Sequence, residues 1–304
     1  MPQLPRVVGA ITSIALLTAA CGAAGGATSD GRPVVLTTFT VLADIAANVA
    51  GGRLRVESIT RPGVEVHGYE PTPADVKKAA RADLVVDNGL GLEAWAAKYT
   101  EDAGAPRVVA SAGVTPIPIS EDARAGEPNP HAWMSPLTTR AYVDNLVAAF
   151  SDLAPEHAGH FRANGERYRA ELLRAHEDLV SALRAVPEDR RSLVTCEGAF
   201  PYLARDAGLT DHYLWAVNAE RQATPRQVAR VVDHVRAAGV PAVFCESTVS
   251  DAPMRQVAAA TGAAFGGVLH VDSLSEPDGP VPTYLDLIRH DARTIAAALT
   301  GGAR

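Results

Sequence analysis

The chain has 304 residues, of which 47% are hydrophobic and 21% are charged. This composition excludes an intrinsically disordered protein, and the length predicts two domains with a substantial buried core. Acidic residues outnumber basic ones by 35 to 28, and no basic run is present, so we expect no nucleic acid partner.

The first 20 residues have the pattern of a secretory signal peptide. An uncharged run from Val7 to Ala20 follows one Arg, and it is too short for a comfortable membrane span. Cys21 follows directly in LTAAC, which resembles a bacterial lipobox, although Thr18 stands where Leu is usual. An ordinary secretory signal with a chance Cys is the alternative. We expect residues 1–20 to be a signal peptide and 21–33 a lipidated tether on the outer face of the cytoplasmic membrane.

Strand and helix patterns then alternate through the first half of the chain. Thr72 and Pro73 mark one helix start, and Gly51 and Gly52 mark one helix end. Strands are predicted at 34–38, 55–60, 84–88, 107–110 and 114–119, and helices at 41–51, 71–82 and 92–99. The alternation predicts a parallel sheet with helices on both faces.

A long helical pattern separates this region from a second alternating one. It covers 154–186, interrupted only by Gly159 and Gly165, and would span roughly 45–50 Å at 1.5 Å per residue. Beyond it, strands are predicted at 192–196, 212–217, 241–247 and 263–271, and helices at 198–208, 224–239, 251–262 and 281–299. We therefore predict an α/β fold with two lobes, 34–153 and 188–304, joined by a linking helix over 154–187.

Four metal-capable side chains follow predicted strands. In open parallel sheets, ligands bind beyond the carboxyl ends of the strands. The four residues are His67 in RPGVEVHGYEP, His131 in NPHAWMSP, Glu197 in TCEGAF and Asp272 in LHVDSLS. Each has a structural alternative: a loop histidine often only packs, Glu197 could complement a helix dipole, and Asp272 could form a turn. Their shared topological position, two in each lobe, favours one site in the cleft between the lobes.

Two neutral imidazoles and two carboxylates carry a charge of −2, which matches one divalent cation. Nitrogen and oxygen donors suit manganese, iron(II) and zinc, whereas soft copper(I) would require sulfur. Because these ligands bind in their deprotonated forms, metal affinity should fall in acid. His270 and Glu246 are candidates for the surroundings of the site.

Cys196 and Cys245 each lie in an apolar strand-like run. They could pair in an oxidising compartment, and two buried free thiols are equally plausible. The chain has no Cys/His zinc pattern.

The sequence resembles the metal-type solute-binding lipoproteins of ABC importers over about residues 34–300. Matching blocks include FTVLADIAANVAG, NPHAWMSP, VTCEGAFPYLARDAGL and VDSLS. The resemblance implies that His67 and His131 are the ligands from the first lobe, and that Glu197 and Asp272 are those from the second. It also implies a stiff linking helix and a membrane permease as partner.

The family resemblance also bears on the metal. Zinc members usually carry a histidine where Glu197 stands, and often a His-rich loop where this chain has SEDARAGEPN. The chain therefore resembles the manganese/iron branch, while a zinc-specific binding protein of the same family remains an alternative, since affinity order alone favours zinc.

We expect a monomeric protein that captures Mn²⁺, or else Fe²⁺ or Zn²⁺, and carries out no reaction. A secreted metallohydrolase is the rival class, but the sequence lacks HxH, HExxH and DxH clusters. An adhesin role has no specific support in the sequence.

Overall fold

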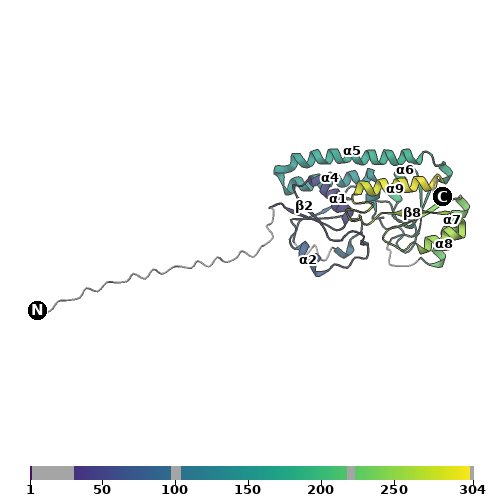
Figure 1. Ribbon diagram of the computed structural model, residues 1–304, viewed down its shortest axis with the longest axis horizontal. Helices are drawn as coiled ribbons and strands as arrows, with labels where there is room; N and C mark the ends of the chain where they lie inside the picture. The colour runs from purple at the N-terminus through teal and green to yellow at the C-terminus, as the bar shows by residue number, and fades with distance from the viewer. Residues whose placement is uncertain (2–30, 97–103, 218–222, 302–304) are drawn as a thin grey trace. The chain divides into compact units, whose positions relative to one another are not determined.

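The computed structural model describes residues 1, 31–96, 104–217 and 223–301, and residues 32–304 form one compact unit (Figure 1). Cys21, the predicted signal peptide and most of the predicted tether lie outside the described residues. Among the helices of the described part, none is both long and apolar enough to cross a membrane.

The first half of this unit, the amino lobe, is built on a four-stranded parallel sheet. Its strand order is β2-β1-β3-β4. The central strands β1 and β3 are fully buried, which agrees with their continuous apolar sequences. The strands are β1 (Val34–Thr37), β2 (Arg55–Ser58), β3 (Leu84–Asp87) and β4 (Arg107–Val109).

Two helices of the amino lobe confirm the signals read from the sequence. Helix α1 (Thr40–Ala50) ends at Gly51, which adopts a left-handed conformation with φ 54°. Helix α2 (Pro73–Ala79) begins with a capping box between Thr72 and Asp75. Of the helix predicted at 92–99, residues 94–96 are helical in the structure, and residues 97–99 lie outside the described residues.

The strand predicted at 114–119 is wrong. This segment forms only an isolated bridge between Pro118 and Pro128. Pro116 and Pro118 have no N–H group, so they cannot complete a backbone ladder. Ile117 and Ile119 instead exchange hydrogen bonds with the returning chain at 126–129. His131 therefore follows a hairpin-like loop rather than a sheet strand.

The predicted linking helix is continuous through both of its glycines. Helix α5 (Ala158–Leu183) has 26 residues and is preceded by a short 3-10 turn, η2 (Pro155–His157). At 1.5 Å per residue it spans roughly 39 Å. It packs on α1 and on α4 (Pro136–Leu153) of the amino lobe. It also packs on α6 (Pro201–Ala207) and α9 (Tyr284–Leu299) of the second half, so one helix contacts both halves (Figure 1).

Gly165 explains how α4 and α5 pack so closely. A Cβ atom on Gly165 would lie 2.6 Å from Cγ2 of Val147 on α4. A side chain at this position would therefore push the two helices apart. The glycine that looked like an interruption in the sequence is a helix-packing residue.

The second half, the carboxy lobe, contains two parallel strand pairs, β5–β6 and β7–β8. The strands are β5 (Ser192–Glu197), β6 (Thr210–Trp215), β7 (Ala242–Glu246) and β8 (Ala264–Leu269). The helices are α6 (Pro201–Ala207), α7 (Pro225–Ala238), α8 (Ala252–Thr261) and α9 (Tyr284–Leu299). These elements agree with the alternation predicted from the sequence.

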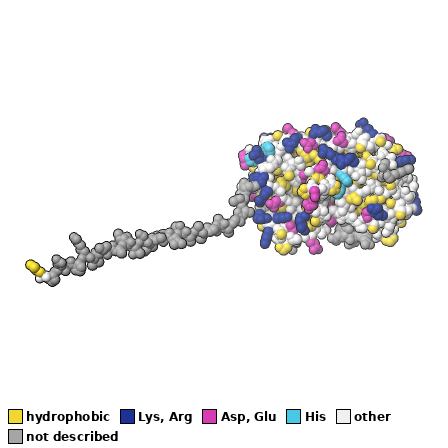
Figure 2. All heavy atoms as spheres, in the orientation of Figure 1, with side chains coloured by type: hydrophobic (Ala, Val, Ile, Leu, Met, Phe, Trp, Pro, Cys, Tyr) yellow, Lys and Arg dark blue, Asp and Glu magenta, His cyan; other side chains and the backbone are white. Residues whose placement is uncertain are grey.

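Two hydrophobic clusters are relevant to the site. The larger one contains buried side chains from both lobes and from α5, so the lobes share one core. The second contains Cys196, Cys245 and apolar residues of α7 and α8. On the face shown in Figure 2, basic and acidic side chains are interspersed rather than gathered into a patch of one sign.

Candidate metal-binding site

The four residues predicted as ligands lie together. The Nε2 atoms of His67 and His131 are 3.0 Å apart. Glu197 Oε1 lies 3.2 Å from the first of these nitrogens and 3.6 Å from the second. Asp272 Oδ1 lies 3.8 and 3.9 Å from the same two atoms. Two nitrogens and two carboxylate oxygens therefore converge on one point.

The site draws one residue from each of four segments. His67 lies in the loop between β2 and α2, and His131 directly precedes the 3-10 turn η1 (Ala132–Met134). Glu197 is the last residue of β5, and Asp272 follows the end of β8. All four side chains are buried, with His67 the most exposed at 4%.

Asn129 fixes the tautomer of His131. Its Oδ1 atom accepts hydrogen bonds from the main-chain N–H of His131 and from Nδ1 of the ring, both at 3.0 Å. A proton on Nδ1 leaves Nε2 of the neutral ring with a free lone pair. That lone pair faces the other three residues, which is the orientation required of a metal ligand.

The loop that carries His67 is held by two other side chains. Glu65 accepts hydrogen bonds from the N–H groups of His67 (2.8 Å) and Gly68 (3.0 Å). The indole Nε1 of Trp95 donates to the carbonyl oxygen of Val66 at 2.8 Å. The backbone on either side of the imidazole is therefore fixed by hydrogen bonds.

Burial lowers the pKa of both histidines of the site. It lowers the pKa of His67 to about 3, with a further effect of Arg124. The pKa of His131 also lies well below its ordinary value, through burial first and then His67 and Arg124. The imidazoles are therefore neutral, the form that binds metals.

Asp272 lies among other acidic groups. Burial, followed by repulsion from Glu197 and Glu65, raises the pKa of Asp272 well above its ordinary value. No amide, hydroxyl or ammonium group of the described residues donates to either of its oxygens. A cation at the meeting point of the four side chains would stabilise this carboxylate in its charged form.

Three hydrogen bonds tie the amino-lobe segments to the residues beside the carboxy-lobe carboxylates. Asn129 Nδ2 donates to the carbonyl of Gly198, next to Glu197, at 2.6 Å. Trp133 Nε1 donates to the carbonyl of Val271, next to Asp272, at 3.1 Å. The N–H of Gly63 donates to Ser273 Oγ at 2.7 Å. The lobes are thus connected directly around the site.

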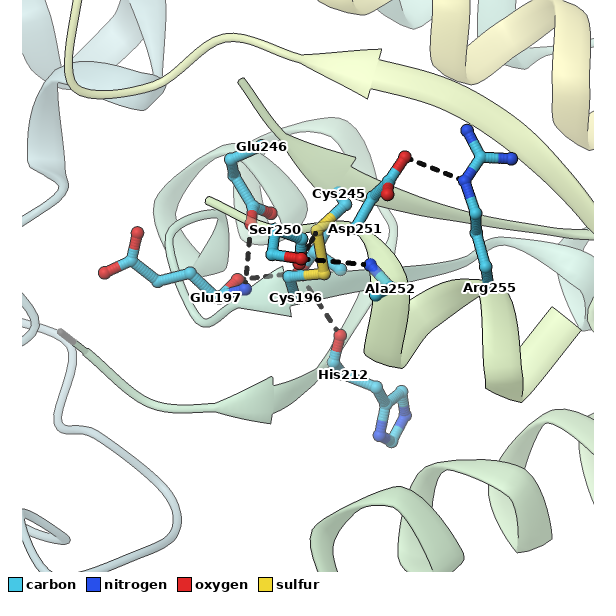
Figure 3. The surroundings of a disulfide bond; sticks show 10 residues. Cys196, Glu197, His212, Cys245, Glu246, Ser250, Asp251, Ala252 and Arg255 are labelled. Atoms are coloured by element: carbon cyan, nitrogen blue, oxygen red, sulfur yellow. Dashed lines mark hydrogen bonds and ion pairs between the residues drawn. A yellow bond between two sulfur atoms is a disulfide. The ribbon is translucent and has the colours of Figure 1, made fainter. Parts of the chain in front are cut away.

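Cys196 and Cys245 form a disulfide with their Cα atoms 4.8 Å apart, so the structure contains the paired form of the two alternatives (Figure 3). Glu246, next to Cys245, accepts a hydrogen bond from the N–H of Glu197 at 3.0 Å. Burial raises the pKa of Glu246 to about 8. Glu246 therefore contacts the backbone of a predicted ligand.

His270 lies in a different environment from Asp272. Its N–H donates to Asp291 Oδ1 at 3.0 Å, and its ring packs against His290 with centroids 5.1 Å apart. Strand β8 ends at Leu269, so both His270 and Asp272 lie beyond the end of the strand.

Sequence reasoning missed Asn129, Glu65 and the donor role of Trp133. Asn129 and Glu65 each stand two residues before a histidine, and an Asn at that spacing can bond the local backbone through its short side chain. The contacts to Gly198 and Val271 had no signal in the sequence, because each joins segments that are distant along the chain.

The donor set determines which chemistry the site supports. Two neutral nitrogens, two carboxylates and no sulfur suit a divalent ion of the manganese, iron or zinc type. The four side chains come from four different segments and meet at one buried point, so they can enclose an ion.

Known proteins with similar sequences bind metals. The chain matches the family described as zinc-uptake complex component A, periplasmic (ZnuA), over residues 35–298. It is 48% identical to the iron-binding protein YfeA of Yersinia pestis, covering 86% of this chain and 85% of that one. It is 32% identical to the manganese-binding lipoprotein MntA of Halalkalibacterium halodurans, covering 95% and 97%.

Solved structures show the same fold. A manganese-bound periplasmic metal-binding protein from Candidatus Liberibacter asiaticus is 38% identical, with a TM-score of 0.83 over 88% of this chain and 100% of that one. The periplasmic zinc-binding protein TroA of Treponema pallidum is 26% identical, with a TM-score of 0.80 over 88% and 99%. The chain therefore belongs to the ZnuA family, as a two-lobed metal-binding solute-binding protein of the ABC-transporter class and not an enzyme.

Proposed function

We propose that this protein captures Mn²⁺ outside the cytoplasmic membrane and delivers it to the permease of an ABC importer. The ligands are His67, His131, Glu197 and Asp272. The observation that carries the proposal is the convergence of their nitrogen and oxygen atoms, which all lie within 4.8 Å of one another, with each nitrogen 3.2–3.9 Å from an oxygen of each carboxylate.

Manganese is favoured over zinc by the chemistry of the donors. Two carboxylates can each bind through both oxygens, which raises the coordination number above the four that zinc prefers. Relatives named as manganese-binding and iron-binding proteins support this branch. The zinc-binding relative TroA makes zinc the main competitor, so the experiment must compare the two metals directly.

The amino terminus anchors the protein. Residues 1–20 are removed as a signal peptide, and Cys21 is acylated so that residues 21–33 form a tether. Residues 34–153 and 188–304 are the two metal-binding lobes, and 154–187 is the linking helix. Support comes from the apolar run before Cys21 and from the relative named as a lipoprotein. A Cys21→Ser variant should move from the membrane fraction to the soluble fraction of cells.

Calorimetric titration of metal-stripped protein tests the metal site. Mn²⁺ should bind once per chain, and His131→Ala and Glu197→Ala should each weaken binding at least tenfold. His157→Ala and Glu166→Ala are matched controls outside the site, and they should bind as the parent does. If the two site variants bind Mn²⁺ as tightly as the parent, the ligand assignment is wrong.

Elemental analysis of protein purified without added metal, followed by competition between Mn²⁺ and Zn²⁺, tests the choice of metal. Protein that carries manganese supports the proposal. Protein that carries zinc, and that loses none of it to a large excess of manganese, would establish a zinc-binding protein instead.

A further inference from the structure

The two carboxylates of the site lie on opposite sides of a break in the carboxy-lobe sheet. Ladders join β5 to β6 and β7 to β8, and no ladder joins β5 to β7, both of which are fully described. Glu197 ends β5, whereas Asp272 follows β8. We call the line between β5 and β7 the seam. The distance between the two carboxylates therefore depends on what holds the seam together.

Apolar side chains of β5 and β7 share the same hydrophobic clusters across the seam, and two bonds join the strands directly behind Glu197. The first is the disulfide between Cys196 and Cys245. The second is the hydrogen bond from the N–H of Glu197 to Glu246 Oε2, at 3.0 Å. In Figure 3 the carboxylate of Glu197 extends away from the disulfide, while Glu246 lies against the backbone of Glu197. Each cysteine immediately precedes one of these glutamates.

The two halves of a parallel sheet are normally held in register by backbone hydrogen bonds. At the seam a covalent bond and the Glu246 side chain, together with apolar packing, hold the two strands in register. Both cysteines and Glu246 are buried, with exposures of 0%, 0% and 2%, so no water-filled gap separates the strands at this point. A metal site requires its ligand atoms within about 0.2 Å of their proper distances. A small relative shift of β5 and β7 would exceed that tolerance.

We propose that the Cys196–Cys245 disulfide is a positioning element of the metal site. It fixes β5 against β7 so that Glu197 and Asp272 bind the same ion, and its reduction lowers metal affinity. This inference rests on the proposed function, because it concerns the same four ligands. The cysteines are not among the four proposed ligands, and they act through the backbone of Glu197.

Reduction is a two-electron step. With a water-soluble phosphine as reductant, phosphorus attacks one sulfur, the Sγ–Sγ bond breaks, and each sulfur takes up one proton. Water supplies the oxygen of the phosphine oxide that forms. The products are two thiols on β5 and β7, which are no longer bonded across the seam.

The experiment compares Mn²⁺ affinity in the metal-stripped parent and in the double variant Cys196→Ala/Cys245→Ala. We expect at least tenfold weaker binding, about 1.4 kcal/mol, in the variant. Cys196→Val/Cys245→Ala restores buried volume and serves if the first variant fails to fold. Parent protein reduced by the phosphine, with its two thiols counted, should show the same loss, and reoxidation should restore affinity.

Val257→Ala is the matched control for lost stability. Val257 is buried on α8 in the same hydrophobic cluster as the cysteines. This variant should unfold at a lower temperature but bind Mn²⁺ within twofold of the parent. Equal loss of affinity in the control and in the double variant would show a general effect of stability, and would overturn the positioning role.

The electron paramagnetic resonance spectrum of bound Mn²⁺ reports the geometry of the ligands, which a loss of folding stability alone does not change. Electron paramagnetic resonance should show an altered, broader signal in the disulfide-free protein, because the two carboxylates no longer share one fixed geometry. An unchanged affinity and spectrum would overturn this inference while leaving the ligand assignment intact. Unchanged affinity in His131→Ala and Glu197→Ala would instead overturn the proposed function.

Discussion

The side-chain amide of Asn129 donates to the main-chain carbonyl of Gly198, with 2.6 Å between nitrogen and oxygen. The same amide accepts from the ring of His131. One residue of the amino lobe therefore orients its own neighbouring imidazole and binds the backbone beside Glu197. This arrangement couples a proposed nitrogen ligand to a proposed oxygen ligand from the other lobe through a single planar group.

Replacing Asn129 by Ala should weaken metal binding. The variant loses the acceptor that keeps the proton on Nδ1 of His131, and it loses the contact to Gly198. Loss of such outer contacts typically costs 10–100-fold in metal affinity. Calorimetric titration with Mn²⁺ measures the effect.

Asn145→Ala is the matched control for this experiment. Asn145 lies on α4 and also donates through its side-chain amide to main-chain carbonyls, those of Ala110 and Ala112. Its variant should bind Mn²⁺ as the parent does. Equal affinities in parent and Asn129→Ala would contradict a role for Asn129 in orienting His131.

Trp133→Phe should destabilise the protein. The substitution removes the indole N–H that donates to Val271 and leaves a buried carbonyl without this donor. The expected loss in the free energy of unfolding is about 1–3 kcal/mol from the unsatisfied carbonyl, with more from the smaller ring. Denaturant-induced unfolding of the metal-free protein gives the value.

Trp95→Phe is the matched control, because it also removes an indole N–H that donates to a main-chain carbonyl. Trp95 also donates its indole N–H to a carbonyl, that of Val66, but its side chain is only partly buried. Water can replace part of this contact, so the loss should be smaller. Equal losses in the two variants would argue against a special contribution of the contact between Trp133 and Val271.

Glu197→His should shift the metal preference of the proposed site towards zinc. The substitution changes the donors from two nitrogens and two carboxylates to three nitrogens and one carboxylate, and it changes the ligand charge from −2 to −1. Zinc accepts additional imidazoles readily, whereas manganese prefers oxygen.

Competition between Mn²⁺ and Zn²⁺, measured on the parent and on this variant, gives the ratio of affinities. We expect that ratio to move at least tenfold in favour of zinc. Glu166→His on the exposed face of α5 controls for an added histidine. A ratio that does not change would show that Glu197 has no influence on selectivity.

Asp211→Asn should stabilise the protein more at pH 8 than at pH 5. Burial raises the pKa of Asp211 from 3.8 to about 7, and its Oδ1 atom has no hydrogen-bond partner in the described part of the chain. Because the folded-state pKa is the higher one, the carboxyl group lowers stability progressively as pH rises from about 4 to about 7. Asparagine does not ionise.

Thermal unfolding at the two pH values measures this difference. The advantage of the variant over the parent should be at least about 3 °C larger at pH 8, about 1 kcal/mol for a chain of this size. Asp233→Asn, at an exposed position on α7, is the control for the same substitution outside the buried site. An equal advantage for Asp211→Asn at both pH values would refute the burial argument.

The sequence was sufficient for most of the fold because apolar periodicity, capping residues and terminal glycines agree along the chain. Thr72 and Gly51 mark helix ends that the structure contains. It was insufficient at 114–119, where apolar residues alternate as in a strand but the prolines cannot complete a ladder. The alternation of apolar residues predicts only on which side each side chain lies. A β-ladder also requires backbone N–H groups, which proline lacks.

The candidate site was predictable in part. The shared position of His67, Glu197 and Asp272 after strands followed from topology alone. The pairing of Cys196 with Cys245 did not, because it depends on which strands become neighbours. The contacts of Asn129 and Trp133 depend on how the two lobes meet, which no local pattern records.

The close approach of α4 and α5 at Gly165 has a consequence for the site. Helix α4 begins at Pro136, five residues after His131. A shift of this helix would therefore move the segment that carries the imidazole. A single added methyl group at Gly165 would meet Val147 and displace α4 along its contact with α5. The location of one proposed metal ligand is thus governed in part by a residue with no side chain, in a helix that contributes none of the four proposed ligands.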